Sequence, residues 1–334
     1  MTFHHFGIIG AGSWGTALAL VAAQAGRKVS LWARDPTHAA DMAITHANTR
    51  HLSGLTLPPA ITPTCEPNAL RDADVILLAT PAQTIRSIAG LFANIPAKTC
   101  PAVICAKGIE FGSGALMSEV VAEVMPGRCI AVLSGPTFAG EVARGLPTAV
   151  TLACAQIDVA ERLTESLATP TFRPYFSDDV IGVEIAGALK NVIAIACGIL
   201  VGRGLGENAR ASLITRGLVE IQRLAVAKGG RAATVMGLGG VGDLMLSCAS
   251  TQSRNFAFGK LIGEGMPVAE ALARPDIIVE GVHTARAIPR LAQAMAVDLP
   301  ICAAVANVLH EGSDIDREMA NLLSRPLREE GLRH

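Results

Sequence analysis

The segment Phe6-Gly7-Ile8-Ile9-Gly10-Ala11-Gly12-Ser13-Trp14-Gly15 decides the fold of this 334-residue chain. Apolar residues over 6–10 predict a short buried strand, and an apolar helix over 13–25 follows, closed by Gly26. Between them the three glycines form the pattern G-x-G-x-x-G, in which the first permits a tight turn, the second lets the backbone approach a pyrophosphate, and the third allows close helix–strand packing. The segment therefore predicts a dinucleotide-binding turn, with a tight turn that binds nothing as the alternative.

The alternation of strand and helix continues outward from this turn. We predict helices over 83–93, 115–124 and 157–168, a helix beginning near Pro36, and strands over 28–33, 74–80, 102–106, 128–133 and 148–153. Nearly continuous apolar strands linked by helices are typical of a parallel sheet buried on both faces. The sequence thus predicts an α/β fold in which residues 1–180 form a doubly wound, Rossmann-type dinucleotide-binding domain.

The second half of the chain has helical spacing only. Ser177-Asp178-Asp179 predicts a helix cap, and the helix after it extends to about residue 199. Further helices are predicted over 209–227, 255–262, 267–273, 284–294 and 301–311. We therefore expect residues 181–334 to form an all-helical, substrate-binding domain.

The composition argues against several classes of protein. Half of the residues are hydrophobic, 17% are charged and the net charge is −1, so a folded globular protein that binds neither nucleic acid nor an anionic membrane is expected. The eight cysteines form no Cys-x-x-Cys, and the histidines show no zinc-ligand spacing, which favours reduced thiols and no metal. No Lys or Arg precedes the apolar start, and the apolar stretch 192–201 is too short to cross a bilayer. We expect a cytoplasmic protein without membrane insertion.

The end of the second predicted strand bears on the choice of cofactor. An acidic residue there favours NAD, whereas an arginine can accommodate the 2′-phosphate of NADP. Here Arg34 is followed directly by Asp35, so both cofactors remain open, with NADP favoured. The alternative for Arg34 is an ordinary exposed charge.

Two lysines are candidates for the chemistry. Lys107 follows a predicted strand, where ligands of open α/β sheets bind, although a solvated strand-end lysine is an equal alternative. Lys190 has small or apolar residues three and four positions away on both sides, and desolvation would lower its pKa toward that of a general acid or base. Glu184 and Asn191 could be its polar partners, and a lysine that reaches out to solvent is the alternative.

Two later segments predict contacts with an anion. The glycine-rich stretch 237–243 ends on Asp243, and its backbone can approach a ligand closely. Ser253-Arg254-Asn255 precedes a predicted helix and offers a hydroxyl, a guanidinium and an amide for a phosphate. The same three residues could simply cap the helix.

Together these motifs resemble bacterial NAD(P)-dependent glycerol-3-phosphate dehydrogenase along essentially the whole chain. Seven motifs match in register: Gly10-Ala11-Gly12-Ser13-Trp14-Gly15-Thr16, Lys107-Gly108-Ile109-Glu110, Ser134-Gly135-Pro136-Thr137-Phe138-Ala139, Ala188-Leu189-Lys190-Asn191, residues 239–243, Ser253-Arg254-Asn255 and Val279-Glu280-Gly281. One motif alone would be ambiguous, whereas seven in order are specific.

The resemblance implies reversible hydride transfer between NAD(P)H and dihydroxyacetone phosphate, giving sn-glycerol 3-phosphate for phospholipid synthesis. It implies that Lys190 donates and accepts the proton at the substrate's C2 oxygen. It implies substrate contacts at Lys107, Gly135, Thr137, Lys190, Asp243, Ser253, Arg254 and Asn255. It implies cofactor contacts at Gly10, Gly12, Ser13, Trp14, Gly15, Arg34, His51, Lys107, Ala139, Arg254, Ile278 and Glu280.

The chain departs from the family pattern at one position. His51 stands where the family usually has a tyrosine, so the cofactor contact there would have to come from an imidazole. Two other functions remain as alternatives: another dehydrogenase of this architecture, of the 6-phosphogluconate or β-hydroxyacid type, and a non-catalytic nucleotide sensor. A small-molecule substrate and a homodimer are the partners expected.

Overall fold

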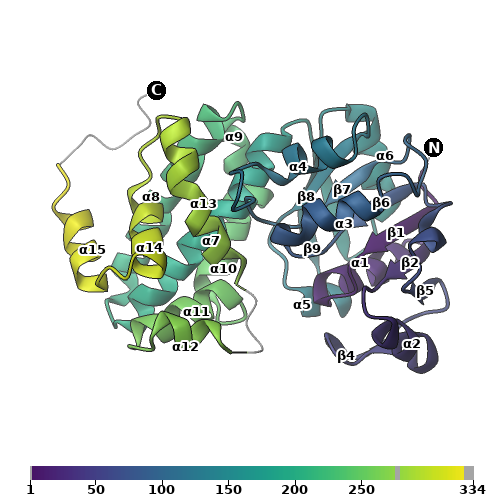
Figure 1. The fold of residues 1–334 in the computed structure, drawn as a ribbon, viewed down its shortest axis with the longest axis horizontal. Coiled ribbons are helices and arrows are strands. Elements are labelled where there is room, and N and C mark those ends of the chain that lie inside the picture. The colour runs from purple at the N-terminus through teal and green to yellow at the C-terminus, as the bar shows by residue number, and fades with distance from the viewer. Residues whose placement is uncertain (1, 275–278, 327–334) are drawn as a thin grey trace. The chain divides into compact units, whose positions relative to one another are not determined.

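The computed structural model describes residues 2–274 and 279–326, and its chain divides into two compact units (Figure 1). The first unit contains Met1–Lys107 and Ala115–Glu184, and the second contains Gly108–Gly114 and Ile185–His334. We predicted a single division at 180/181 and did not anticipate that residues 108–114 belong with the second unit.

The first unit is built on an eight-stranded sheet with the order β10-β9-β8-β7-β6-β1-β2-β5. Each predicted strand and helix between residues 6 and 168 is present with bounds that agree within two residues. The strands are β1 (His5–Ile9), β2 (Lys28–Trp32), β5 (Ile61–Thr64), β6 (Val75–Leu78), β7 (Ala102–Ile104), β8 (Ile130–Ser134), β9 (Thr148–Cys154) and β10 (Phe172–Ser177). A separate hairpin joins β3 (Ala47–Asn48) to β4 (Leu52–Thr56). The doubly wound α/β architecture is present, whereas β5, β10 and the hairpin were not predicted.

One strand direction differs from the prediction. β9 pairs antiparallel with β8, while the other pairs in the sheet are parallel. The helix between β8 and β9, α5 (Ala139–Ala143), has five residues and spans only about 8 Å. A five-residue strand such as β8 is about 17 Å long. The helix is therefore too short to carry the chain back to the edge of the sheet at which β8 begins, as a parallel β9 would require. The expectation that β9 runs parallel to β8 is therefore wrong.

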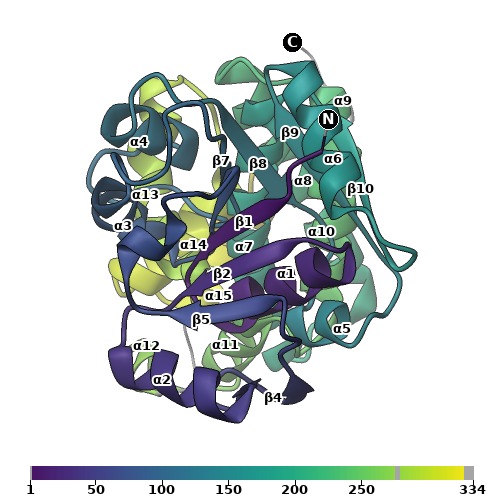
Figure 2. The same ribbon diagram turned by 90° about the vertical axis from the view of Figure 1, so that its right-hand side faces the viewer.

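Helices cover both faces of this sheet (Figure 2). On one face lie α1 (Ser13–Gln24), α5 and α6 (Ile157–Leu167), and on the other lie α3 (Ile85–Leu91) and α4 (Met117–Val124). Successive strand residues enter opposite cores, so Ile8 packs in the first and Ile9 in the second. Burial on both faces explains the continuous apolar strands in the sequence. The remaining helices of this unit are α2 (Pro36–Thr45) and the 3-10 turns Pro67–Leu70 and Ala82–Thr84.

From residue 185 onward, the described part of the second unit is helical. It contains α7 (Val180–Gly202), α8 (Gly206–Ala227), α9 (Ala232–Val235), the π-helix Leu238–Gly242, α10 (Asp243–Ala249), α11 (Arg254–Gly263), α12 (Val268–Leu272), α13 (Glu280–Ala294), α14 (Pro300–His310) and α15 (Ile315–Leu323). α7 is capped by Asp179, whose side chain accepts a hydrogen bond from Gly182 N at 2.9 Å, as the acidic cap in the sequence predicted.

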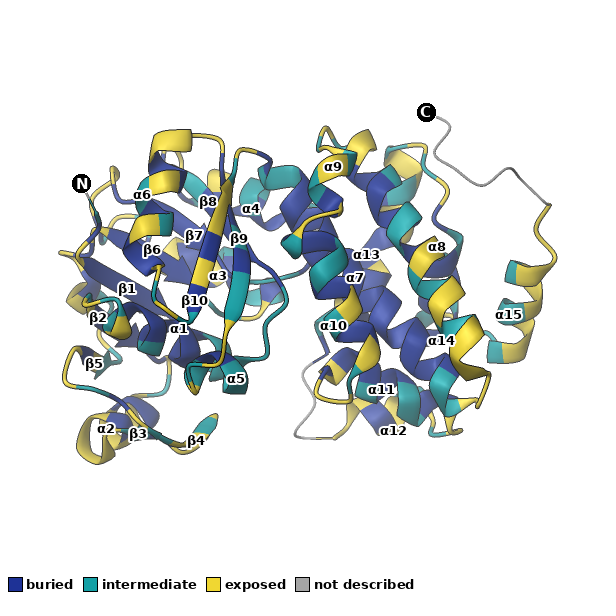
Figure 3. Ribbon diagram, turned by 180° about the vertical axis from the view of Figure 1, so that it is seen from behind, coloured by how far each residue is buried: buried dark blue, intermediate teal, exposed yellow. Residues whose placement is uncertain are grey.

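α7 is the core helix of this unit (Figure 3). The stretch 192–201 is part of this longer helix, whose 23 residues are long and apolar enough to cross a membrane by length and composition. Its most apolar window is nevertheless 89% buried inside the protein, which is the pattern of a core helix. A Cβ on Gly198 would lie 2.1 Å from Phe256 O, and one on Gly259 would lie 2.1 Å from Ile195 O, so these glycines let the backbones of α7 and α11 touch.

Candidate active site

The three glycines of the turn after β1 have different roles: packing of the chain requires two of them, and the third is open to a ligand. A Cβ on Gly15 would lie 1.8 Å from Gly10 O, and Gly10 itself has φ +114°, so chain packing alone requires both glycines. Gly12 is different, because a Cβ there would meet nothing within 4 Å. No side chain caps the first turn of α1, whose backbone N–H groups are therefore available to an anion. Open space at Gly12 beside an uncapped helix start fits a dinucleotide pyrophosphate.

The β3–β4 hairpin is tied to this turn. The buried Asn48 donates to Ala11 O at 2.8 Å, and its Oδ1 lies 3.0 Å from a ring nitrogen of His38. Ser13 Oγ donates to His51 O at 2.7 Å, and the His51 and His38 rings meet edge to face with centroids 5.2 Å apart. Burial and the neighbouring His38 lower the pKa of His51, which favours the neutral ring. The sequence analysis did not identify this connecting role of Asn48, because a single asparagine in a hairpin forms no recognisable sequence motif.

Arg34 and Asp35, the two charged residues that follow β2, have different environments in the structure. Asp35 caps α2 by accepting from Thr37 N at 3.0 Å, and it forms a 2.7 Å ion pair with Arg50. Hydrogen bonding to Arg50 lowers the pKa of Asp35. Arg34 is exposed and forms no hydrogen bond or ion pair with the described residues. Of the two, Arg34 is therefore the side chain still available to a ligand.

Other predicted cofactor residues lie around the same turn. Trp14 on α1 and Ala139 on α5 pack against the core on that face of the sheet. Within the described part of the chain, Trp14 Nε1 and Thr80 Oγ1 are buried without a hydrogen-bond partner, a costly condition that a bound polar ligand could relieve. Ile278 lies outside the described residues, and Glu280 is the first residue of α13 in the second unit.

Lys107, Gly135 and Thr137 come together at the carboxyl ends of β7 and β8. Lys107 Nζ donates to Gly135 O at 3.0 Å, and Thr137 Oγ1 donates to the same oxygen at 3.2 Å. Gly135 adopts φ +155°, and a Cβ there would lie 2.9 Å from Val150 Cα. Parallel strands bring their carboxyl ends to one edge of a sheet, which is where such folds bind ligands. These three predicted substrate residues are thus brought together at the expected edge.

The second unit holds a buried cluster around Lys190. Lys190 Nζ lies 3.0 Å from Asp243 Oδ1 and donates to Ser247 Oγ at 2.7 Å. Asp243 is 1% exposed and Ser247 is 2% exposed. Ser247 is four positions after Asp243 on α10, which places both on one face of the helix. Lys190 is therefore a buried cation whose charge is balanced by a carboxylate.

Asp243 is placed by the π-helix that leads into α10. A Cβ on Gly240 would lie 1.9 Å from Val235 O, so only glycine allows this close approach. Single π-turns of this kind are frequent at functional sites. Sequence analysis missed Ser247, although its spacing from Asp243 on a helix was a usable signal.

The polar partners expected for Lys190 have other roles. Glu184 accepts hydrogen bonds from Ser118 N, at 2.8 Å, and from Ser118 Oγ. Asn191 Oδ1 accepts from Asn255 Nδ2 at 2.9 Å. Adjacent positions on a helix point in different directions, so Asn191 cannot follow Lys190 to Asp243. Asp243 and Ser247, which the sequence analysis did not assign to Lys190, are its close polar partners in the structure.

Ser253, Arg254 and Asn255 have three different environments. Ser253 caps α11 by accepting from Phe256 N, as the capping alternative predicted. Asn255 is buried and bridges two segments: its Nδ2 donates a hydrogen bond to Asn191 Oδ1, and its Oδ1 accepts one from Gly281 N at 2.9 Å. Arg254 is exposed and lines a cavity of about 370 Å³ together with two further cations, Lys260 and Arg274, and with Glu264, which pairs with Lys260 at 3.4 Å. Of the three, only Arg254 combines a charge with an open position.

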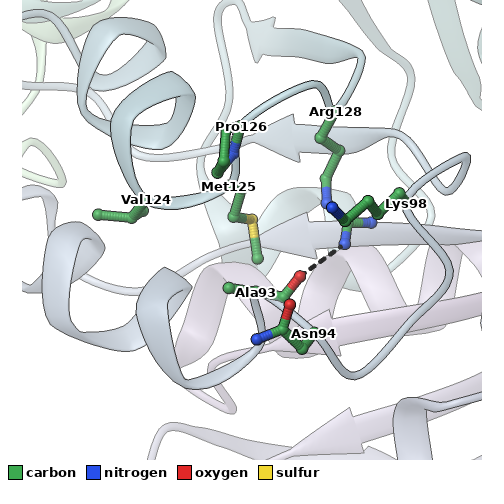
Figure 4. Close-up of a pocket in the computed structure, with 7 residues that line it drawn as sticks. All are labelled: Ala93, Asn94, Lys98, Val124, Met125, Pro126 and Arg128. Carbon is green, nitrogen blue, oxygen red and sulfur yellow. Dashed lines mark hydrogen bonds between the residues drawn. The ribbon is translucent and has the colours of Figure 1, made fainter.

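A second cavity lies away from these residues (Figure 4). It measures about 230 Å³ and contains none of the predicted site residues. Arg128, just before β8, lines it and donates to four backbone carbonyls of residues 93–100, among them Cys100 O at 2.7 Å. These hydrogen bonds hold the segment that leads into β7 in place. We assign it a structural role at the amino ends of the strands.

Comparisons with known proteins point to one family. Models of the NAD-dependent glycerol-3-phosphate dehydrogenase N-terminus and C-terminus match residues 5–160 and 179–320. The chain is 51% identical over 328 residues to glycerol-3-phosphate dehydrogenase [NAD(P)+] of Rhodospirillum rubrum, covering 98% of this chain and 94% of that protein. It is 51% identical over 330 residues to the Caulobacter vibrioides protein of the same name, covering 99% and 100%. The crystal structure of glycerol-3-phosphate dehydrogenase from Coxiella burnetii superimposes with a TM-score of 0.92 at 40% identity, covering 96% and 99%.

Proposed function

Because the chain belongs to the NAD-dependent glycerol-3-phosphate dehydrogenase family, we propose that it interconverts dihydroxyacetone phosphate and sn-glycerol 3-phosphate with NADPH or NADH. The observation that carries the proposal is the buried Lys190–Asp243 pair with Ser247 beside it. A buried charge is costly unless it is paired, and buried ionisable groups cluster at functional sites.

Lys190 is the proton donor and acceptor in this proposal. In the direction of reduction, its ammonium gives a proton to the C2 oxygen of the substrate, and in oxidation the neutral amine takes that proton back. Asp243, at 3.0 Å, favours the ammonium form, and Ser247 helps hold the nitrogen in place. A bound nicotinamide would supply or accept the hydride. Arg254, exposed beside two other cations, binds the substrate phosphate.

The cofactor would be held at the glycine turn of the first unit. Gly12 and the first turn of α1 would bind the pyrophosphate, and Arg34 would contact the adenosine ribose or its 2′-phosphate. Lys107, Gly135 and Thr137 at the sheet edge would contact the substrate. We propose the same role for Ser253 and Asn255, with His51, Trp14, Ala139, Ile278 and Glu280 as further cofactor contacts.

The test is oxidation of NADPH and NADH by the purified protein with dihydroxyacetone phosphate. Lys190→Ala should lower kcat by about a hundredfold to ten-thousandfold. The matched control is Lys98→Ala, an exposed lysine beside the second cavity, which should leave kcat unchanged. A nucleotide sensor would bind NADPH normally yet show no turnover that depends on Lys190. Turnover of 6-phosphogluconate or a β-hydroxyacid in place of dihydroxyacetone phosphate would identify the other dehydrogenase type.

Finer expectations about the cellular role rest on the same proposal. We propose that the protein works in the cytoplasm as a homodimer and supplies glycerol 3-phosphate for phospholipid synthesis. Sedimentation of the purified protein measures the oligomeric state. Depletion in the source cells, followed by measurement of phospholipid synthesis with and without added glycerol, tests the cellular role.

A further inference from the structure

Two cysteines of the first unit lie at the same end of neighbouring strands. Cys129 immediately precedes β8, and Cys154 is the last residue of β9. Because these strands are antiparallel, the start of β8 lies beside the end of β9, and Ala131 is the register partner of Cys154. The two Sγ atoms are 3.4 Å apart.

The two side chains also share one face of the sheet. Cys129 lies two residues before Ala131, so both point to the side on which Cys154 lies. Ala131 and Cys154 belong to one buried core, and Cys129 packs against its margin. A disulfide needs its sulfurs at about 2.05 Å, so the pair must close by only about 1.4 Å, a change that side-chain rotation can supply.

The surroundings of this pair favour an ionised thiol. Cys154 lies just before α6, whose N-cap is Gln156, and its sulfur accepts a hydrogen bond from Gln156 N–H and lies within hydrogen-bond distance of the Cys129 sulfur. Those contacts lower the pKa of Cys154, whereas burial raises the pKa of Cys100 to about 11. Since the thiolate is the reactive form, this pair should react before the isolated buried thiols. Cys129 is only partly buried, which gives a small oxidant access.

We propose that Cys129 and Cys154 are an oxidation site that forms a reversible intramolecular disulfide on reaction with a peroxide. One sulfur attacks a peroxide oxygen, the O–O bond breaks, and a sulfenic acid and one water form. The other thiol then attacks the sulfenic sulfur, forming the S–S bond and releasing a second water. The two thiols lose two electrons and two protons, and hydrogen peroxide is reduced to two molecules of water. This site is independent of the proposed dehydrogenase activity.

Peptide mapping of the folded protein tests this directly. The protein is treated with hydrogen peroxide, free thiols are alkylated, and the unfolded chain is digested with trypsin without reduction. Cleavage after Arg128, Arg144 and Arg162 places each cysteine in its own peptide, 129–144 and 145–162. We expect these peptides to be joined by a disulfide that dithiothreitol releases, with the protein still monomeric on a denaturing, non-reducing gel.

Single variants provide the controls. Cys129→Ser and Cys154→Ser should each abolish the linked peptide, and Cys129→Ser, at the more exposed position, suffices if the buried variant fails to fold. Cys65→Ser, which removes another partly exposed thiol of the same unit, should leave the linked peptide intact. The proposal is overturned if peroxide oxidises Cys65 while Cys129 and Cys154 both stay open to alkylation. Linkage only between chains would overturn it as well.

Discussion

Alanine substitutions at Gly15 and Gly12 should have opposite effects on stability and cofactor binding. At Gly15 the new Cβ would lie 1.8 Å from Gly10 O, whereas carbon and carbonyl oxygen normally keep about 3.3–3.6 Å apart. α1 must therefore move by about 1.5 Å from β1, and overpacking of this kind costs about 1–3 kcal/mol. That cost exceeds the gain of about 1 kcal/mol that Gly→Ala normally brings inside a helix.

A displacement of this size places the overpacking cost near the upper end of that range, so the net cost is about 2 kcal/mol after the helix gain. We therefore expect Gly15→Ala to lower the melting temperature by roughly 4–8 °C, taking 2–4 °C per kcal/mol for a unit of this size. Gly12→Ala is the matched control, because its Cβ would meet nothing in the protein. Its stability should change by less than about 1 kcal/mol. A methyl group would nevertheless hold the pyrophosphate away from the N–H groups of α1, at a cost of about 1.5–3 kcal/mol, or about 10- to 100-fold in the Kd for NADPH.

The assays are thermal unfolding without ligand and titration of NADPH by nicotinamide fluorescence. The reasoning is refuted if Gly15→Ala melts at the temperature of the parent protein. It is equally refuted if Gly12→Ala binds NADPH as tightly as the parent, since the open space above that glycine would then have no part in binding.

Three further predictions concern single charges. Asp243→Asn should lower kcat at least tenfold because it removes the counter-charge of the buried Lys190. Asp316→Asn, at an exposed ion pair with Arg203, should change kcat less than twofold, and equal kcat values for the two variants would contradict this. Arg34→Ala should raise KM for NADPH at least tenfold more than KM for NADH, and equal changes would remove Arg34 from the 2′-phosphate site. Burial raises the pKa of Glu220 from 4.5 to about 7, so the folded protein keeps a proton that the unfolded chain loses and stability should fall as pH rises from 4.5 to 7. Glu220→Gln should flatten this fall in thermal unfolding, and an unchanged slope would show that another group is responsible.

The candidate site was predictable where its chemistry is local in sequence. The glycine turn needs three residues within six positions, and the apolar neighbours of Lys190 lie on its own helix, so both leave a pattern that periodicity can detect. Ser247 and Asn48 leave none that we used, because their roles depend on contacts with Lys190 and Ala11, far away in the chain. Spacing on a helix suggested Glu184 as a partner of Lys190, whereas its contact with Ser118, 66 positions away in the chain, leaves no local pattern.

The amino-acid sequence by itself determined the alternating α/β half, the helical half, the dinucleotide turn and the family, because each follows from local periodicity or from motifs in order along the chain. Tertiary structure alone decided which way β9 runs and which residues meet across the fold. Had β9 been parallel to β8, Cys129 and Cys154 would lie at opposite edges of the sheet; the antiparallel pairing brings their sulfurs to 3.4 Å. The physical reason is that strand direction depends on how a short connection such as α5 closes against the sheet, which apolar patterning does not encode.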